Sequence, residues 1–177
     1  NYFFDEQNEL VSVDNHFAMQ IFFQDGGSME IHYDPQYDRP DKPTWFVGGG
    51  VDETGRYLFV SATPGTDKND LIVADLGDPK RPNVRAPIKP VVTGADANYA
   101  PLGVANGKLY LQVDKDAPNR KIVAAPVATP GPTNWVSVIP EGTMPIEGAT
   151  MVDGQIGVLS LQDVASVVKP YSLDGKT

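Results

Sequence analysis

VGGGVDETGRYLFVSA, residues 47–62, is the stretch of this 177-residue chain that decides its fold. It joins a small-residue segment, a turn that contains Gly55 and an apolar segment typical of a β-strand. A polar loop (64–70) and a second apolar segment (71–76) follow. A further apolar segment at 88–92 completes the unit. The pattern predicts four consecutive antiparallel strands joined by short connections.

The same plan returns twice along the chain. In the second copy the expected strands and turn are 100–104, Asn106-Gly107, 108–113, 121–127 and 135–139. In the third copy they are 148–152, Asp153-Gly154, 155–161 and 166–173. The turn glycines of the three copies recur at about the 40–50 residue period of four-stranded propeller blades. Asn-Gly and Asp-Gly favour two-residue hairpin turns, so the strands on either side are predicted to be antiparallel neighbours.

The repeat predicts an all-β protein, a partial β-propeller of about three and a half four-stranded antiparallel blades. We expect residues 1–177 to form a single partial propeller domain. Its predicted parts are an incomplete blade at 1–42, blades at 43–93 and 94–143, and an incomplete blade at 144–177. In the first part, three strands are expected around 2–4, 19–23 and 29–33, without an innermost strand. A chain that begins and ends inside a blade is expected to be a fragment, an excised domain or one half of an assembly that closes through a partner.

Small residues gather in the first strand of each copy, where blades converge on the propeller axis. They are Gly48, Gly49, Gly50, Ala100, Gly103, Gly148 and Ala149. A flexible loop is the alternative explanation, but repetition at one place in three copies favours an inner strand. Gly55, Gly107 and Gly154 are predicted to be structural, because they occupy turns that need positive backbone angles.

Composition excludes several classes of function. The formal net charge is −9, which argues against nucleic-acid binding, because phosphate contacts depend on clustered Lys and Arg. The chain has no cysteine, so disulfides, thiolate metal sites and a cysteine nucleophile are excluded. No segment approaches the roughly 20 apolar residues that span a bilayer. We therefore expect a soluble protein without membrane contact, in a cytoplasmic or periplasmic compartment that the sequence leaves open.

One serine invites comparison with a catalytic nucleophile. Ser28 follows two glycines, but a nucleophile elbow needs a second glycine after the serine and a helix beyond it. Here a strand is expected after Ser28, and the two histidines of the chain, His16 and His32, lie in the same segment. A small serine enzyme built on these residues is an alternative, but without an elbow we assign no catalytic residue.

Two polar loops contain oxygen ligands that suit calcium. Residues 114–119 and 66–70 each combine Asp and Asn, but both lack the central Gly and distal Glu of a calcium loop. Both lie at equivalent hairpin tips, where Asp, Asn and Pro favour turns. We therefore expect solvated turns and predict neither a metal site nor a cofactor.

Several segments in combination resemble the propeller domain of the prolyl oligopeptidase family of serine peptidases. They are residues 39–45, 52–58, 65–71, 117–122, 134–135, 139–141 and 161–164. The resemblance implies part of a seven-bladed propeller in an enzyme that cleaves short peptides after proline. It also implies that the catalytic triad lies in an α/β-hydrolase domain that is absent from this chain. That domain of the same parent protein and short proline-containing peptides are the implied partners.

The resemblance also implies positions for three residues. Ala74 matches a position that often faces the substrate cavity, and Phe3 is the nearest match to an aromatic residue that lines the substrate pocket. Core packing on a blade face is an equal alternative for Phe3. Trp45 is predicted to have a structural role at the interface of stacked sheets, where full burial would make its removal cost about 3–5 kcal/mol.

The function predicted from these observations is the substrate-gating propeller portion of a prolyl oligopeptidase-like serine peptidase. The chain by itself is expected to be inactive. The alternative is a stand-alone propeller-like module that binds a protein or peptide through its loops. Open blade faces at both ends predict self-association, because unstacked apolar sheets and unpaired strand edges recruit partners.

Overall fold

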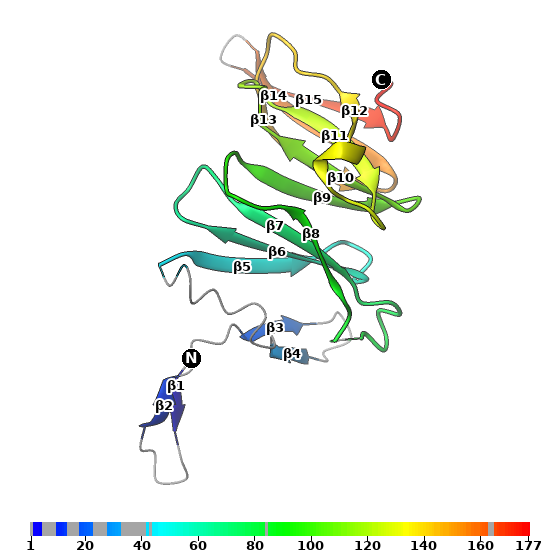
Figure 1. Cartoon of the computed structure of the whole chain (residues 1–177). Coiled ribbons are helices and arrows are strands. Elements are labelled where there is room, and N and C mark those ends of the chain that lie inside the picture. The colour runs from blue at the N-terminus through cyan, green and yellow to red at the C-terminus, as the bar shows by residue number, and fades with distance from the viewer. Residues whose placement is uncertain are drawn as a thin grey trace.

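A computed structural model gives the arrangement of the chain (Figure 1). It describes residues 2–4, 10–13, 18–22, 28–32, 42, 44–83, 85–162 and 165–177, with only the backbone of the strands before residue 42. Within these ranges the protein consists of antiparallel β-sheets and one short 3-10 helix. The described part of the chain contains no helix long and apolar enough to cross a membrane.

The first sheet contains the four strands of the first predicted copy. They are β5 (Phe46–Val51), β6 (Tyr57–Thr63), β7 (Asp70–Asp75) and β8 (Ile88–Val92), hydrogen-bonded in that order. All neighbours are antiparallel. Because sequence order and spatial order coincide, the sheet is a simple meander. The predicted four-stranded plan is confirmed here, including the fourth strand at 88–92.

The second sheet repeats this order. It contains β9 (Tyr99–Ala105), β10 (Lys108–Val113), β11 (Lys121–Pro126) and β12 (Val136–Ile139). The 3-10 helix η2 (Pro132–Asn134) lies in the connection that leads to β12. Proline-rich sequence in that connection keeps it out of the ladder, since proline has no backbone donor.

The third sheet contains three strands, β13 (Ile146–Val152), β14 (Gln155–Gln162) and β15 (Ala165–Ser172). Each neighbouring pair is again antiparallel. The predicted strands at 148–152, 155–161 and 166–173 agree with these bounds to within two residues. The three sheets together confirm an all-β partial propeller.

The N-terminal strands form two separate pairs. Strand β1 (Tyr2–Phe4) pairs with β2 (Leu10–Val13), and β3 (Ala18–Phe22) pairs with β4 (Ser28–His32). The three strands predicted there do not share a sheet, and β2 was not foreseen. The division of the chain into blades at residues 42, 93 and 143 stays a prediction.

Two hairpin turns have the geometry expected for their sequences. Asn106 and Gly107 have φ values of 50° and 72°, and Asp153 and Gly154 have φ values of 49° and 73°. Two consecutive positive φ angles define the hairpin turn that Asn-Gly and Asp-Gly favour. Gly55 lies in a longer turn and has a φ of 70°. Its backbone N–H donates to the carbonyl oxygen of Asp52 at 2.9 Å.

These three sheets stack in sequence order, and two junctions lie between them (Figure 1). The first junction, between the first and second sheets, is filled by an apolar cluster that includes Leu71, Val73, Leu109 and Leu111, each at most 2% exposed. The second junction, between the second and third sheets, is filled by a cluster around Tyr110, Ile122, Ile156 and Val158. Burial of these side chains is what holds one sheet on the next.

Candidate functional site

The N-terminal serine lies on a strand. Ser28 is the first residue of β4 and pairs with Phe22 of β3, while His32 is the last residue of β4. The strand predicted after the serine is therefore confirmed, and the helix that a nucleophile elbow requires is replaced by a strand. His16 lies outside the described residues. No catalytic residue is assigned.

The residues carried over from the resemblance lie in different environments. Ala74 in β7 is 4% exposed and belongs to an apolar cluster with Leu58 and Val60, so its burial does not support the predicted cavity-facing role, which stays a prediction. Phe3 lies in β1, outside the described side chains. Trp45 is half-buried, and the Lys42 Nζ lies 3.7 Å from the centre of its ring. Removal of the Trp45 side chain should therefore lower the free energy of unfolding by less than removal of a fully buried indole would.

Polar residues at the start of β7 close the first junction. The Asn69 Nδ2 donates to the Tyr99 carbonyl oxygen at 3.0 Å, and the Tyr99 backbone N–H donates to the Asn69 Oδ1 at 2.8 Å. The Ala95 N–H donates to a carboxylate oxygen of Asp70 at 2.8 Å. Asn69 and Asp70 are both 5% exposed. The prediction that this loop is a solvated turn is therefore wrong at these two residues, because they bind the backbone that leads into the next sheet.

The corresponding residues of the second sheet close the second junction in a more exposed setting. The Asn119 Nδ2 donates to the Gly142 carbonyl oxygen at 2.9 Å, and the Asn119 N–H donates to the Glu141 Oε1 at 2.7 Å. The Arg120 guanidinium donates to the carbonyl oxygens of Ile146 and Glu147 at 2.7 and 2.9 Å. Both side chains thus tie the hairpin of one sheet to the entry of the next.

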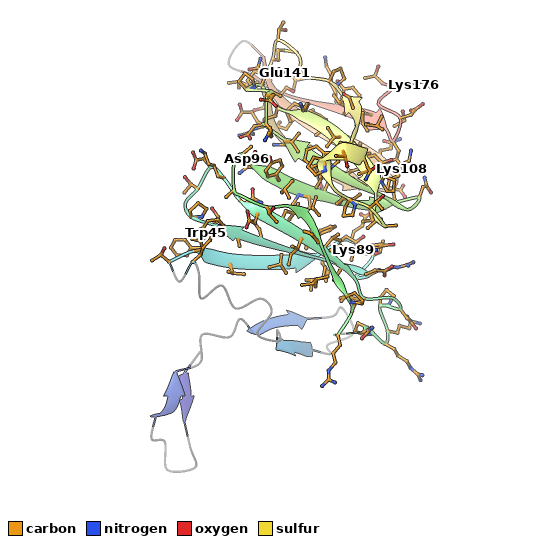
Figure 2. All side chains as sticks on the ribbon, in the orientation of Figure 1. Trp45, Lys89, Asp96, Lys108, Glu141 and Lys176 are labelled. Atoms are coloured by element: carbon orange, nitrogen blue, oxygen red, sulfur yellow. The ribbon has the colours of Figure 1, made fainter. Side chains whose placement is uncertain are left out.

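The links between sheets share one side of the molecule. Figure 2 shows Asp96, in the link between the first and second sheets, on the same side of the stack as Glu141, in the following link. Lys108 and Lys176 lie on the opposite side. The loop predicted to be a solvated turn at 114–119 also belongs to the link side, and the Asn98 N–H donates to the Asp114 Oδ1 at 2.8 Å. Among the described residues, no cluster of three or more acidic or histidine side chains could hold a metal ion.

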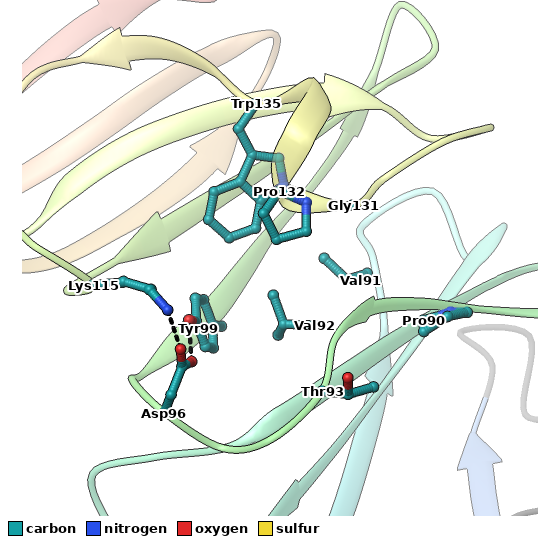
Figure 3. Close-up of a pocket in the computed structure, with 10 residues that line it drawn as sticks. All are labelled: Pro90, Val91, Val92, Thr93, Asp96, Tyr99, Lys115, Gly131, Pro132 and Trp135. Carbon is teal, nitrogen blue, oxygen red and sulfur yellow. Dashed lines mark hydrogen bonds and ion pairs between the residues drawn. The ribbon is translucent and has the colours of Figure 1, made fainter.

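A groove of about 440 Å³ lies along the first junction (Figure 3). One wall is strand β8 with the residues that follow it, and the other is the connection before β12. Its lining residues are Pro90, Val91, Val92, Thr93, Asp96, Tyr99, Lys115, Gly131, Pro132 and Trp135. Elements that are well separated in sequence therefore meet at this groove, and apolar side chains make up most of its wall.

Two aromatic residues shape the groove. The rings of Tyr99 and Trp135 meet edge to face, with centroids 5.9 Å apart and planes at 64°. The Trp135 Nε1–H donates to the Pro130 carbonyl oxygen at 2.9 Å, which fixes the indole relative to its own connection. Tyr99 is 3% exposed and Trp135 is half-buried. The indole is therefore a rigid wall whose polar atom is already bound.

Acidic side chains determine the electrostatics at one end of the groove. The Tyr99 hydroxyl donates to the Asp96 Oδ1 at 2.5 Å, and the Lys115 ammonium forms an ion pair with the Asp96 Oδ2. Burial, this hydrogen bond and the charges of Asp96, Asp114 and Asp116 all raise the pKa of Tyr99. The hydrogen bonds from Lys115 and Tyr99 lower the pKa of Asp96. Asp96 is therefore an ionised carboxylate at neutral pH.

Sequence reasoning missed this groove. Asn134-Trp135 supports the family resemblance, and Trp135 also opens the predicted strand at 135–139, but neither Asp96 nor Lys115 is singled out by the sequence. Their meeting depends on how the second sheet stacks on the first, which a linear pattern does not contain. One usable signal was the pair of aromatic residues at the ends of the second copy, since Tyr99 opens its first strand and Trp135 immediately precedes its last.

Comparison with protein-family models identifies a match to "Prolyl oligopeptidase, N-terminal beta-propeller domain" over residues 34–177. This range contains all three of the sheets described above and more than half of the chain.

Two curated relatives are prolyl endopeptidases. The protein from Elizabethkingia meningoseptica is 33% identical over 134 residues, and that from Elizabethkingia miricola is 31% identical over 134 residues. Each alignment covers 76% of this chain but 18% of the relative. The chain therefore spans less than a fifth of the length of these relatives.

Solved structures show the same fold. A prolyl oligopeptidase B from Galerina marginata, bound to a 35mer hydrolysis and macrocyclization substrate, matches with a TM-score of 0.70 and 18% identity. The match covers 92% of this chain and 24% of that chain. A structure from a study of two prolyl endopeptidases matches with a TM-score of 0.67 and 23% identity, over 84% of this chain and 20% of that chain.

Proposed function

Because the chain belongs to the family of prolyl oligopeptidase N-terminal β-propeller domains, we propose that it is the part of a serine peptidase that controls access of substrates to a separate catalytic domain. The proposed parent enzyme cleaves short peptides after proline. The chain supplies a wall and supplies no catalytic residue of its own.

The observation that carries this proposal is the way the sheets are stacked. Each of the three sheets begins with an edge strand rich in small residues, which are β5, β9 and β13. Small residues let consecutive sheets approach each other where a propeller is narrowest. Apolar side chains fill both junctions, so the stack is a rigid wall suited to exclusion by size.

The proposed partners follow from the parent enzyme. The α/β-hydrolase domain would hold the nucleophile, its base and its orienting carboxylate. Short proline-containing peptides would reach that domain, while folded proteins would be excluded by the surrounding wall. The prolyl endopeptidase names of the curated relatives support this class of substrate.

The proposal is tested on the full-length natural protein that carries this chain. One substrate is a fluorogenic short peptide with a single proline bond, and the other is a folded protein that displays the same bond in a surface loop. We expect a kcat/KM ratio strongly in favour of the short peptide. Removal of residues 43–177 should reduce that ratio by at least about tenfold.

Because the deletion can misfold the remainder, a point variant provides a second measurement. Asn69→Ala loosens the buried contact of the first junction, and Asn119→Ala is the matched change at the exposed contact of the second. We expect Asn69→Ala to lower the ratio more than Asn119→Ala does. An unchanged ratio in both the deletion and Asn69→Ala would contradict the gating role. Absence of any cleavage after proline in the wild type would contradict the enzyme class.

A further inference from the structure

The groove of the first junction opens beside β8, the last strand of its sheet, and not at the first strands, on which the proposed gating role rests. We propose that it binds a cationic side chain, above all arginine, from an extended basic peptide segment. The inference is independent of the proposed peptidase function.

The walls of the groove suit the stem of a long cationic side chain. Pro132 and the Trp135 indole provide apolar surface on one side of the groove, and Val92 provides it on the facing side (Figure 3). The methylene groups of arginine or lysine pack on such surface while the charged end stays in a polar environment. An aromatic ring close to the stem also attracts a cation through its π face, and arginine is the more frequent partner.

The charge at the end of the groove determines whether a cationic or an anionic ligand is favoured. Asp96 lines the groove, and the charges of Asp114 and Asp116 act on the adjacent Tyr99. Lys115 is the single cation among the described lining residues. The surplus of negative charge matches the formal charge of −9 of the whole chain. A cationic ligand is therefore attracted, and an anionic ligand is repelled.

The accessible carboxylate is Asp96. Its side chain is 45% exposed, and that of Lys115 is 48% exposed, so solvent screens their ion pair. An incoming guanidinium can replace the ammonium of Lys115 at Asp96, and its planar fork suits a carboxylate better than a single ammonium does. Lys115 thus competes with the ligand, so its removal should strengthen binding. If the Asp96–Lys115 ion pair had a purely structural role, removal of Lys115 would weaken binding.

We expect an extended segment as the occupant because the groove is open and strand β8 bounds it. Pro90 interrupts the donors of that strand, which disfavours addition of a further strand to its edge. Recognition is therefore expected to depend on side chains, and two arginines at alternate positions would place one in the groove and leave the other near Asp116.

Isothermal titration calorimetry on the full-length natural protein tests the proposal. The probe is acetyl-Leu-Arg-Val-Arg-amide, which contains no proline and so avoids the proposed cleavage. The matched peptide has both arginines replaced by citrulline, which keeps the shape and removes the charge. We expect the arginine peptide to bind at least about tenfold more tightly, and its affinity to fall several-fold between 50 and 300 mM salt because screening weakens exposed charge pairs.

Three variants assign the binding to this groove. Asp96→Asn should weaken binding of the arginine peptide at least about fivefold, and Trp135→Leu should weaken it about threefold. Lys115→Met should strengthen it about threefold, and because Lys115 is exposed this variant should still fold. Lys176→Met is the control, since Lys176 forms a comparable exposed ion pair with Asp174 at 2.5 Å elsewhere; it should leave affinity unchanged.

Several results would overturn the proposal. Equal affinity for the arginine and citrulline peptides would mean that charge is not recognised. Unchanged or weaker binding in Lys115→Met would mean that Asp96 does not receive the ligand. Absence of binding at millimolar peptide, in both the wild type and Lys115→Met, would mean that the groove is not a binding site for this class of segment.

Discussion

The two junctions use the same position of the sheet with different chemistry. At the first junction, Asn69 and Asp70 are buried and bind backbone groups of the next sheet and of the link that leads to it. At the second junction, Asn119 and Arg120 do so from a half-buried position, and Arg120 is charged. Each pair immediately precedes or begins the third strand of its sheet, β7 or β11.

The difference shows that the two copies share a structural role at this position, although the residue types differ. Both pairs satisfy backbone groups where the chain passes from one sheet to the next, as close packing requires. A buried amide binds these backbone groups without competition from water. At a half-buried guanidinium, by contrast, water competes for the same backbone groups. The first junction should therefore be the more sensitive of the two to loss of its polar contact.

Asn69→Ala is expected to have the largest effect. It leaves the buried N–H and carbonyl oxygen of Tyr99 without their side-chain partners, and each such group costs about 1–3 kcal/mol. We expect a loss of about 3 kcal/mol in the free energy of unfolding. Urea denaturation monitored by circular dichroism measures it.

Asn119→Ala is the matched change at the second junction. Water can replace its exposed contacts to Gly142 and Glu141, so we expect a loss of about 1 kcal/mol or less. Equal losses in the two variants would show that burial does not distinguish the junctions.

Gly103 sharpens the comparison because it lies in β9, which belongs to both junctions. Its φ is 144°, and a Cβ added there would lie 3.5 Å from the sulfur of Met151 and 4.0 Å from the Cβ of Asp52. Gly103→Ala should therefore cost about 1–2 kcal/mol, mainly through backbone strain.

Gly148 is the control for Gly103. It lies in the first strand of the third sheet, and a Cβ there would meet nothing within 4 Å of the described structure. Gly148→Ala should change the thermal midpoint little, or raise it slightly through a less flexible unfolded chain. A larger loss in Gly148→Ala than in Gly103→Ala would contradict the assignment of strain.

Arg120→Met tests how much the charged contact contributes to the second junction. The substitution removes two hydrogen bonds to carbonyl oxygens and keeps a long apolar stem, so we expect a loss of about 1 kcal/mol. Arg120 has a φ of 65°, and because methionine meets the same backbone cost, this cost cancels in the comparison. Arg120→Lys should recover part of the loss; full recovery would mean that the forked geometry is unimportant.

Much of the fold could be predicted from the sequence because its signals are local. Gly107 and Gly154 mark turns by their need for positive φ, and the apolar segments beside them alternate with polar loops. Such patterns fix strand order within a meander, where neighbours in sequence are neighbours in space. The strand at 10–13 was missed because its residues, Leu-Val-Ser-Val, are too few to show a pattern.

The contacts between sheets could not be predicted in the same way. The sequence around Asn69 is typical of a turn. Only the stacking of the second sheet on the first places Asn69 against Tyr99, which is 30 residues away. Asp96 and Lys115 come together for the same reason. The groove and the polar contacts at the junctions are properties of the stacking of sheets, which depends on many weak apolar contacts and has no short sequence signature.

Alkaline pH provides the smallest and most specific test of the two junctions. Tyr99 lies in the first and Tyr110 in the second, and burial is the first cause that raises the pKa of each. The Asp96 hydrogen bond and three carboxylates raise the pKa of Tyr99 further, whereas only Asp174 adds to burial at Tyr110. A raised folded-state pKa gives stability that is complete below the unfolded value, about pH 10, and is lost as pH rises beyond it.

The free energy of unfolding should therefore fall above about pH 10, and the fall should be shallower when either hydroxyl is removed. We expect Tyr99→Phe to flatten it more than Tyr110→Phe, because more groups oppose ionisation of Tyr99. Urea unfolding at a series of pH values between 8 and 11.5 measures both slopes against the wild type. A larger change of slope in Tyr110→Phe would place the stronger electrostatic constraint at the second junction, and it would reverse the ranking that burial and charge give to the two.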